Sequence, residues 1–348
     1  MLFIYFLHKI TKSGKNIENL YPEALMCTAV SFVSDNHYFG RNLDLEYCYQ
    51  EAVTITPRNY RFHFRNKEKF YTHLAMIGTT TVANGYPLYY DATNEAGLSA
   101  AGLNFPGNAC YGTMEAGVYN IAPFELIPWI LGQCHTIADA KSLLSKTNLV
   151  GIPFSADYPL TDLHWFFADK FGSITVEPLK NGLCITDNPV GVLTNNPPFD
   201  YHLHNLKNYL HLSEKEPENH FAPQLNFKPY SRGMGAVGLP GDLSSASRFI
   251  KATFTKLHSV KPKEESAAVR QFFHILGSVE QQEGCVKVGK GYEKTIYTSC
   301  CNTDKGIYYY TTYENSQISA VDMHKVDLDS SELVSFPLLR ICQIRYEN

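Results

Sequence analysis

The strongest constraint on the fold is the order in which strand-like and helix-like segments follow one another. Residues from about 26 to 105 are rich in β-branched and aromatic side chains interrupted by turn signals, a pattern typical of strands. A helical spacing follows between residues 123 and 146; then strands return, two further helices come next, and strands close the chain. Because strands and helices do not alternate regularly, the order disfavours a doubly wound parallel sheet and predicts a layered α+β domain.

The helical segments carry local signals of their own. Thr136 and Asp139 have the spacing of a capping pair at a helix start. A second helix is expected to begin near Ser244, and a third to run from about residue 264 to 279, each with apolar residues at helical spacing. The later strands are expected at residues 163–168, 173–177, 295–300, 306–312 and 318–323.

Composition narrows the class of protein. The 348 residues contain no Gly/Ser-rich or Pro-rich linker, so one large domain is favoured over several small ones. A net charge of -4 without a long basic run gives no electrostatic footprint for nucleic acid. No stretch approaches the roughly 18 consecutive apolar residues of a membrane span, so no membrane partner is expected.

The N-terminus and the cysteines bear on location. The apolar run 1–7 is short and is followed by Lys9, which makes it a poor secretory signal. A lipoprotein site is disfavoured because bulky Met26 precedes Cys27. The nine scattered cysteines are an odd number in a chain large enough to build its own core, which suits a reducing compartment. A cytoplasmic protein is expected.

Four features with apparent chemical meaning are set aside. The run 284–290 has phosphate-loop spacing, but Gly291 stands where a magnesium-binding hydroxyl is needed. His202 and His204 have no further metal ligand at typical spacing, and residues 201–209 are interpreted as a solvated polar segment. The Cys300-Cys301 pair is expected in the core. The serine at position 99 lies in a run one residue too long for a nucleophile elbow.

The pair Met26-Cys27, followed at once by a strand-like run, suggests a different nucleophile. Removal of residues 1–26, either as an upstream start or as a propeptide, would expose an α-amine on the residue that carries the thiol. An unperturbed α-amine has a pKa of about 7.7 to 8.0 and a thiol one of about 8.5, so the amine can accept the thiol proton near neutral pH. Cys27 would then carry its own general base.

Several motifs in order closely resemble the choloylglycine hydrolase family, and the resemblance spans the chain from Met26 onward. They are Met26-Cys27-Thr28-Ala29, the run 39–46 (FGRNLDLE), the runs 94–98 (NEAGL) and 101–106 (AGLNFP), 163–165 (LHW), 191–197 (GVLTNNP), 238–242 (GLPGD) with 247–249 (SRF), and 308–310 (YYY) with 312–315 (TYEN).

The resemblance implies a four-layer αββα sandwich of the N-terminal nucleophile hydrolase type, without metal or other cofactor, spanning residues 27–348 as one domain. The implied catalytic residues are Cys27, Arg41, Asp44, Asn104, Asn195 and Arg248. Cys27 would be the nucleophile, and its amine the general base and acid. Asp44 would hold the amine, Arg41 and Arg248 would favour the thiolate, and the two asparagines would offer amide donors to the oxyanion.

Each of these residues also has an ordinary structural interpretation. Cys27 in isolation fits a buried strand thiol, and both asparagines precede turn-forming prolines. Arg41 and Asp44 fit a surface ion pair, which would stabilise little. On a regular strand these two face opposite sides, so a bulge or bend at the adjacent Gly40 is expected to bring them together. Arg248 differs, because the dipole of a helix disfavours a cation in the first turn.

The substrate is inferred from the resemblance alone. Asn104 resembles the bile salt hydrolase branch, which implies hydrolysis of glycine- or taurine-conjugated bile acids through a thioester. The alternative is a penicillin V acylase, or another N-acyl amidase, with the same mechanism. A non-catalytic binding protein that never frees Cys27 is the alternative from another class. The family also implies a homotetramer.

Overall fold

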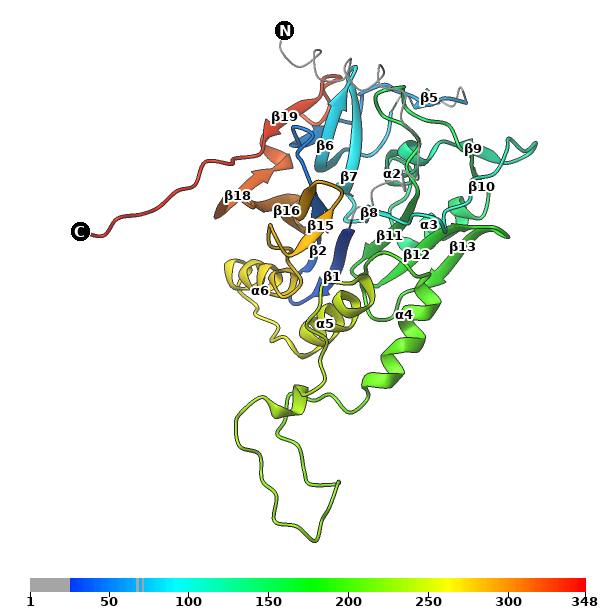
Figure 1. Cartoon of the computed structure of the whole chain (residues 1–348). Coiled ribbons are helices and arrows are strands. Elements are labelled where there is room, and N and C mark those ends of the chain that lie inside the picture. The colour runs from blue at the N-terminus through cyan, green and yellow to red at the C-terminus, as the bar shows by residue number, and fades with distance from the viewer. Residues whose placement is uncertain (1–25, 67–68, 71) are drawn as a thin grey trace.

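Two antiparallel sheets form the centre of the computed structural model, which describes residues 26–66, 69–70 and 72–348 (Figure 1). In the described residues the first sheet has the order β14 (Val192–Leu193), β1 (Met26–Val33), β2 (His37–Leu45), β16 (Gly291–Asn302), β17 (Ile307–Thr312) and β18 (Asn315–Asp322), with β15 (Val286–Val288) pairing to β16.

The second sheet has eight strands within the same described ranges. Their order is β13 (Gly182–Asp187), β12 (Gly172–Leu179), β11 (Leu163–Asp169), β8 (Ser99–Asn104), β7 (Tyr86–Asn94), β6 (Met76–Ala83), β3 (Ala52–Thr56) and β19 (Val334–Pro337). Two short pairs lie outside the large sheets: β4 (Phe62–His63) with β5 (Lys69–Phe70), and β9 (Tyr119–Ile121) with β10 (Thr147–Leu149).

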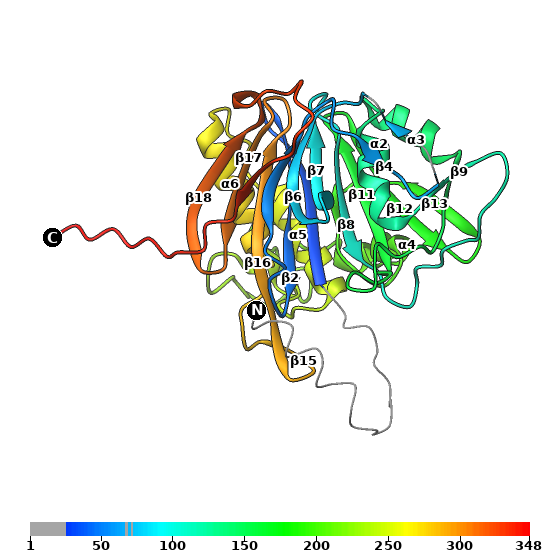
Figure 2. The ribbon, with the colours of Figure 1, turned by 90° about the horizontal axis from the view of Figure 1, so that it is seen from above.

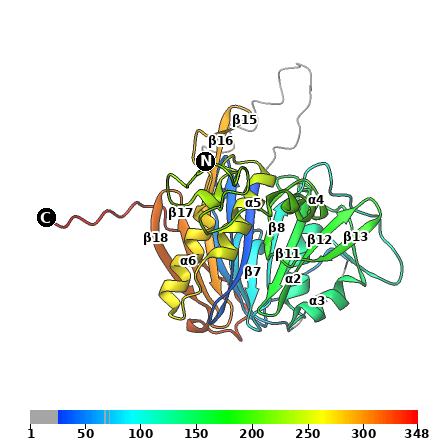
Figure 3. The same ribbon diagram turned by 90° about the horizontal axis from the view of Figure 1, so that it is seen from below.

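Helices cover the outer face of each sheet, which gives four layers. The α-helices are α2 (Leu126–Leu131), α3 (Ile137–Leu144), α4 (Phe199–Asn205), α5 (Ser245–His258) and α6 (Glu265–Gly277). The 3-10 turns are η2 (Pro123–Glu125), η3 (Leu206–Tyr209), η4 (Met234–Ala236) and η5 (Met323–Lys325). Helices α5 and α6 pack on β1, β2 and β16, while α2 and α3 pack on β7, β8, β11 and β12 (Figures 2 and 3). The predicted αββα sandwich is therefore confirmed.

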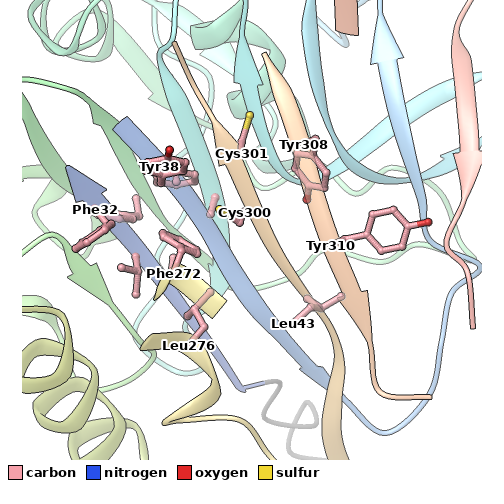
Figure 4. Close-up of a cluster of buried hydrophobic side chains, with 14 of the residues drawn as sticks. Phe32, Tyr38, Leu43, Phe272, Leu276, Cys300, Cys301, Tyr308 and Tyr310 are labelled. Atoms are coloured by element: carbon pink, nitrogen blue, oxygen red, sulfur yellow. The ribbon is translucent and has the colours of Figure 1, made fainter. Parts of the chain in front are cut away.

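The core between the layers follows the alternation of side chains along each strand. On β16, Cys300 points toward Phe272 of α6, and Cys301 points the other way, toward the side where Tyr308 lies (Figure 4). Between the sheets, the rings of Phe39 and Phe166 stack with centroids 5.4 Å apart. Both cysteines are buried, as the sequence predicts.

Most of the local predictions are confirmed. Thr136 caps α3, with its hydroxyl accepting the Asp139 N–H at 3.2 Å and the Asp139 carboxylate accepting the Thr136 N–H at 3.0 Å. Ser244 is the N-cap of α5. The run 284–290 lies in a turn and in β15, which pairs with β16 as a hairpin, so the strand-to-helix setting of a phosphate loop is absent there.

The interpretation of residues 201–209 as a solvated segment is wrong at His202. This stretch belongs to α4 and η3, and the side chain of His202 is fully buried, although His204 is exposed. His202 stacks on Phe249 of α5 with centroids 4.7 Å apart. A short helix with few apolar residues gives a weak periodic signal, so the sequence hides its buried face. No helix in the described part of the chain has the length and apolarity to cross a bilayer.

The β11–β12 hairpin offers a matched test of the core. Phe167 is 0% exposed in the second sheet, whereas Phe171 at the hairpin turn is 84% exposed. We expect Phe167→Ala to lower the free energy of unfolding by about 3–5 kcal/mol, because it removes a buried ring and leaves a cavity. Phe171→Ala should change it by less than about 0.5 kcal/mol. Denaturant titration of both variants measures the difference; equal losses would contradict the packing described.

Candidate active site

Cys27 lies at the beginning of β1, and its thiol faces the space between the two sheets. The residue is 2% exposed, and its Sγ accepts a hydrogen bond from Nη2 of Arg41 on β2. The Nη1 atom of the same guanidinium donates to the carbonyls of Tyr90, at 3.0 Å, and of Gly102. Arg41 thus links the first sheet to β7 and β8 of the second and holds a cation against the thiol.

The prediction of a β-bulge at Gly40 is wrong. The pairing of β1 with β2 runs without a break from Met26↔Asp44 to Val33↔His37. Gly40 has a different role, because a Cβ there would lie 2.0 Å from the Ser299 carbonyl oxygen of β16. The glycine allows the two backbones to approach closely.

The side chains of the site therefore lie on opposite faces of one sheet. Leu43 is directly opposite Cys27 and lies two residues from Arg41, so the side chains of Cys27 and Arg41 share the face toward the second sheet. Asp44 faces the helix layer, where its Oδ1 accepts the Thr295 hydroxyl at 2.7 Å. Near the start of β1 the backbone nitrogen of Cys27 donates to Asn195, which also contacts Arg248 on the helix side and Asn104 on β8.

Arg248 approaches Cys27 from the helix side. Its Nη1 donates to the Cys27 carbonyl and to the Thr28 hydroxyl, each at 2.6 Å, and its Nη2 donates to Asn195 Oδ1 at 2.8 Å. Its Nε donates to the Leu243 carbonyl at 3.0 Å. These four acceptors explain how a fully buried cation is stabilised in the first turns of α5 despite the helix dipole.

Asn195 joins the remaining parts of the site. Its Oδ1 accepts the N–H of Cys27 at 2.8 Å, and its Nδ2 donates to the carbonyl of Asn104 at 2.8 Å. The backbone is anchored in turn, since the Asn195 carbonyl lies 2.9 Å from Nε2 of His202 and its N–H donates to Ser245 Oγ at 2.9 Å. The structure thus gathers all six sequence-predicted residues around the start of β1.

Burial has the largest effect on the pKa values of Cys27 and Asp44. It raises the pKa of the Cys27 thiol above its ordinary value, although Arg41 acts to lower it. Burial also raises the pKa of Asp44 to about 6, against the lowering effects of Arg248 and the Thr295 hydroxyl. Burial outweighs the effect of Arg41, so the thiol of Cys27 needs a nearby base to ionise at neutral pH, which is the role expected of its own α-amine.

A cavity of about 250 Å³ opens beside the thiol. Cys27, Arg41 and Asn104 line it together with a largely apolar wall from both sheets and from the loop at residues 152–161. Leu88 and Trp165 contribute to that wall, and Asp157 adds a carboxyl group. The arrangement suits a substrate with a bulky apolar part next to the bond that the thiol attacks. In the described residues no cluster of three or more His, Cys, Asp or Glu side chains is placed to hold a metal ion.

Sequence reasoning missed the groups that surround Met26. Glu293 is 1% exposed on β16, and its Oε1 accepts the Met26 N–H at 2.6 Å. A charged residue inside a strand-like run was the available signal, but its partner is more than 260 positions away in the sequence. The cavity loop was also missed, since apolar residues among prolines at 152–160 give no strand or helix period.

The chain is similar to known proteins over most of its length. The family model of linear amide C-N hydrolases, choloylglycine hydrolase family, matches residues 27–336. A protein of Lactiplantibacillus plantarum named bile salt hydrolase/transferase is 57% identical over 90% of this chain and 97% of its own length. A protein of the same name from Clostridium perfringens is 38% identical over 93% of this chain and 100% of its own.

Solved structures show the same fold. A variant of conjugated bile acid hydrolase from Clostridium perfringens superposes with a TM-score of 0.86 at 37% identity, covering 92% of this chain and 100% of that one. Penicillin V acylase from Agrobacterium tumefaciens superposes with a TM-score of 0.70 at 20% identity over 89% and 91% of the two chains, a likeness of fold alone. With a matching family model and relatives of this similarity, the chain belongs to the choloylglycine hydrolase family of linear amide C-N hydrolases.

Proposed function

We propose that this protein hydrolyses the amide bond of glycine- or taurine-conjugated bile acids, with Cys27 as the N-terminal nucleophile. The observation that carries the proposal is the thiol of Cys27, held against Arg41 at the wall of a largely apolar cavity. The names of the similar proteins from Lactiplantibacillus plantarum and Clostridium perfringens support the substrate class. A steroid body suits the apolar wall, and the amide would then lie beside the thiol.

The mature enzyme is proposed to begin at Cys27, with residues 27–348 as one domain. The family match begins at residue 27, which supports loss of the preceding residues. The freed α-amine would lie beside Asn195 Oδ1, which is 2.8 Å from the Cys27 nitrogen, while Asp44 pairs with the preceding residue, Met26. An adjacent base is what a thiol with a raised pKa requires.

The reaction is proposed to proceed in two halves. The amine takes the thiol proton, and the sulfur attacks the amide carbon to form a C–S bond, while amide donors at Asn104 and Asn195 stabilise the oxyanion. The C–N bond then breaks as the ammonium returns its proton to the leaving glycine or taurine nitrogen. Water, deprotonated by the amine, attacks the thioester and releases the bile acid and the thiol. Nucleophile and base come from one residue, so the scheme needs no cofactor.

The proposed enzyme is a cytoplasmic bacterial homotetramer. Between α4 and α5 a long segment extends away from the body of the protein (Figure 1). Along it Leu210, Phe221 and Tyr230 are 84%, 93% and 88% exposed. Apolar side chains this exposed on one extended segment are typical of a surface that is buried by another chain.

Cys27→Ser tests the nucleophile. We expect a loss of kcat/KM of at least about a hundredfold toward glycocholate and taurocholate, because a hydroxyl is far harder to deprotonate than a thiol. Cys342→Ser, at an exposed cysteine, is the matched control and should keep normal rates. Turnover of penicillin V is measured beside the bile salts, and intact mass defines the N-terminus. A faster rate with penicillin V would favour the acylase alternative, and an active chain that retains residues before Cys27 would exclude the mechanism.

Arg41→Gln tests the electrostatics of the thiol. Because the Arg41 cation acts to lower the pKa of Cys27, its removal should raise that pKa. The pH midpoint of Cys27 alkylation, followed on the peptide that contains it, should then move up by about one unit or more. Arg270→Gln, an exposed arginine on α6, should leave the midpoint unchanged. A downward or absent shift in Arg41→Gln would refute the role proposed for this residue.

Serine substitutions at Leu210, Phe221 and Tyr230 test the assembly. The unchanged protein should have about four times the mass of one chain by light scattering. The triple variant should dissociate to smaller species, since it removes the apolar contacts. Phe171→Ser, at an equally exposed phenylalanine on the β11–β12 turn, should remain tetrameric. A triple variant that keeps the full mass would place the interface elsewhere.

A further inference from the structure

Three buried side chains with oxygen acceptors surround Met26, the residue before the nucleophile. Glu293 accepts the Met26 N–H through Oε1 at 2.6 Å. Gln281, between α6 and β15, contacts Met26 Sδ through Nε2 at 3.8 Å. Asp44 stands directly opposite Met26 in the pairing of β1 with β2. The exposures of Asp44, Gln281 and Glu293 are 0%, 0% and 1%, so the three lie out of contact with bulk water.

Each of these side chains has one oxygen that no donor in the described part of the chain satisfies. The atoms are Asp44 Oδ2, Gln281 Oε1 and Glu293 Oε2. Buried acceptors in native proteins are nearly always paired with a donor, and leaving one unpaired is destabilising. Three such atoms around one residue indicate that a group with several N–H donors belongs at this place.

The charges around Met26 favour the binding of a cation. Burial raises the pKa of Glu293 to about 8, and the Asp44 carboxylate raises it as well, while the Met26 N–H and Arg248 act to lower it. The negative charge of Glu46 also raises the pKa of Glu293, and that of Glu280 raises the pKa of Asp44. The opposing cations are Arg248 from α5 and Arg41 from β2. An added positive charge would stabilise both buried carboxylates in their ionised form.

We propose that Glu293 and Gln281 join Asp44 in a socket that receives the α-ammonium group of mature Cys27. The inference rests on the proposed function, because this ammonium exists only in a chain that begins at Cys27. The ammonium group brings three N–H donors and one positive charge to the start of β1. One donor meets Asn195 Oδ1, which is already 2.8 Å from the nitrogen, and the others meet the socket directly or through water.

Glu293 is a positioning residue in this scheme, since it acts on the substrate through the amine. Loss of Met26 takes away the N–H that its Oε1 accepts in the full chain. A carboxylate a few ångströms from an ammonium favours the charged form and so raises the pKa of the amine. The amine must be neutral to accept the thiol proton, so activity falls as the pH drops through that pKa.

Glu293→Gln tests the socket in the mature enzyme. The change keeps the shape of the side chain and removes its charge, so the amine pKa should fall. The acidic limb of the kcat/KM profile for glycocholate should therefore move down by about one pH unit. Glu293→Asp keeps the charge and should restore most of the wild-type limb. Glu332→Gln, at an exposed carboxylate, makes the same change in net charge and should leave the limb in place.

If the pH profile of kcat/KM for Glu293→Gln overlies that of the wild type, the proposed socket is wrong. If that variant does not fold, Gln281→Met gives the second measurement, because it removes a socket acceptor at similar volume. The acidic limb should then move in the same downward direction, and an unmoved limb would also overturn the inference. Failure of the proposed function is distinct, since the wild type itself would then fail to cleave glycocholate or would not begin at Cys27.

Discussion

The buried guanidinium of Arg41 is the interaction on which the site depends. It is 1% exposed and lies between the two sheets, where it donates to two carbonyls of the second sheet and to the thiol of the first. A buried cation is stable only when its donors are satisfied, so these acceptors restrict the guanidinium to one position. Its position in turn defines where Cys27 Sγ lies relative to the cavity.

The end of a strand lets both faces of one sheet act on a single residue. Along β1 and β2 the side chains alternate, so the thiol and Arg41 lie on the cavity side, and Asp44 lies on the helix side. A nucleophile in the middle of a strand would have neighbours on its own face alone. At Cys27, the second residue of β1, the backbone nitrogen donates to Asn195, and the carbonyl accepts from Arg248. This arrangement separates groups that act on sulfur from groups that act on nitrogen.

Burial of the site also disfavours ionisation of its thiol and carboxyl groups. It raises the pKa values of the thiol, of Asp44 and of Glu293. Near neutral pH each group is therefore shifted toward its uncharged form in the chain that still carries Met26. An ammonium group at the start of β1 would reverse this tendency for the carboxyl groups of Asp44 and Glu293. The proposed loss of residues 1–26 would therefore change the electrostatics of the site as well as expose a base.

Local sequence signals were enough to predict a layered α+β domain, the capping pair at Thr136 and the start of α5 at Ser244, whereas the four-layer αββα arrangement was implied by the resemblance to the family. Strand alternation, helical periodicity and caps involve residues close together in the chain, so the sequence contains them directly. The six site residues were identified by the order of their motifs and not by geometry. The unbroken register of β1 with β2, the buried face of α4 and the contact of Glu293 with Met26 came from tertiary structure alone. They depend on which distant segments pack together, and local patterns along the chain do not encode that pairing.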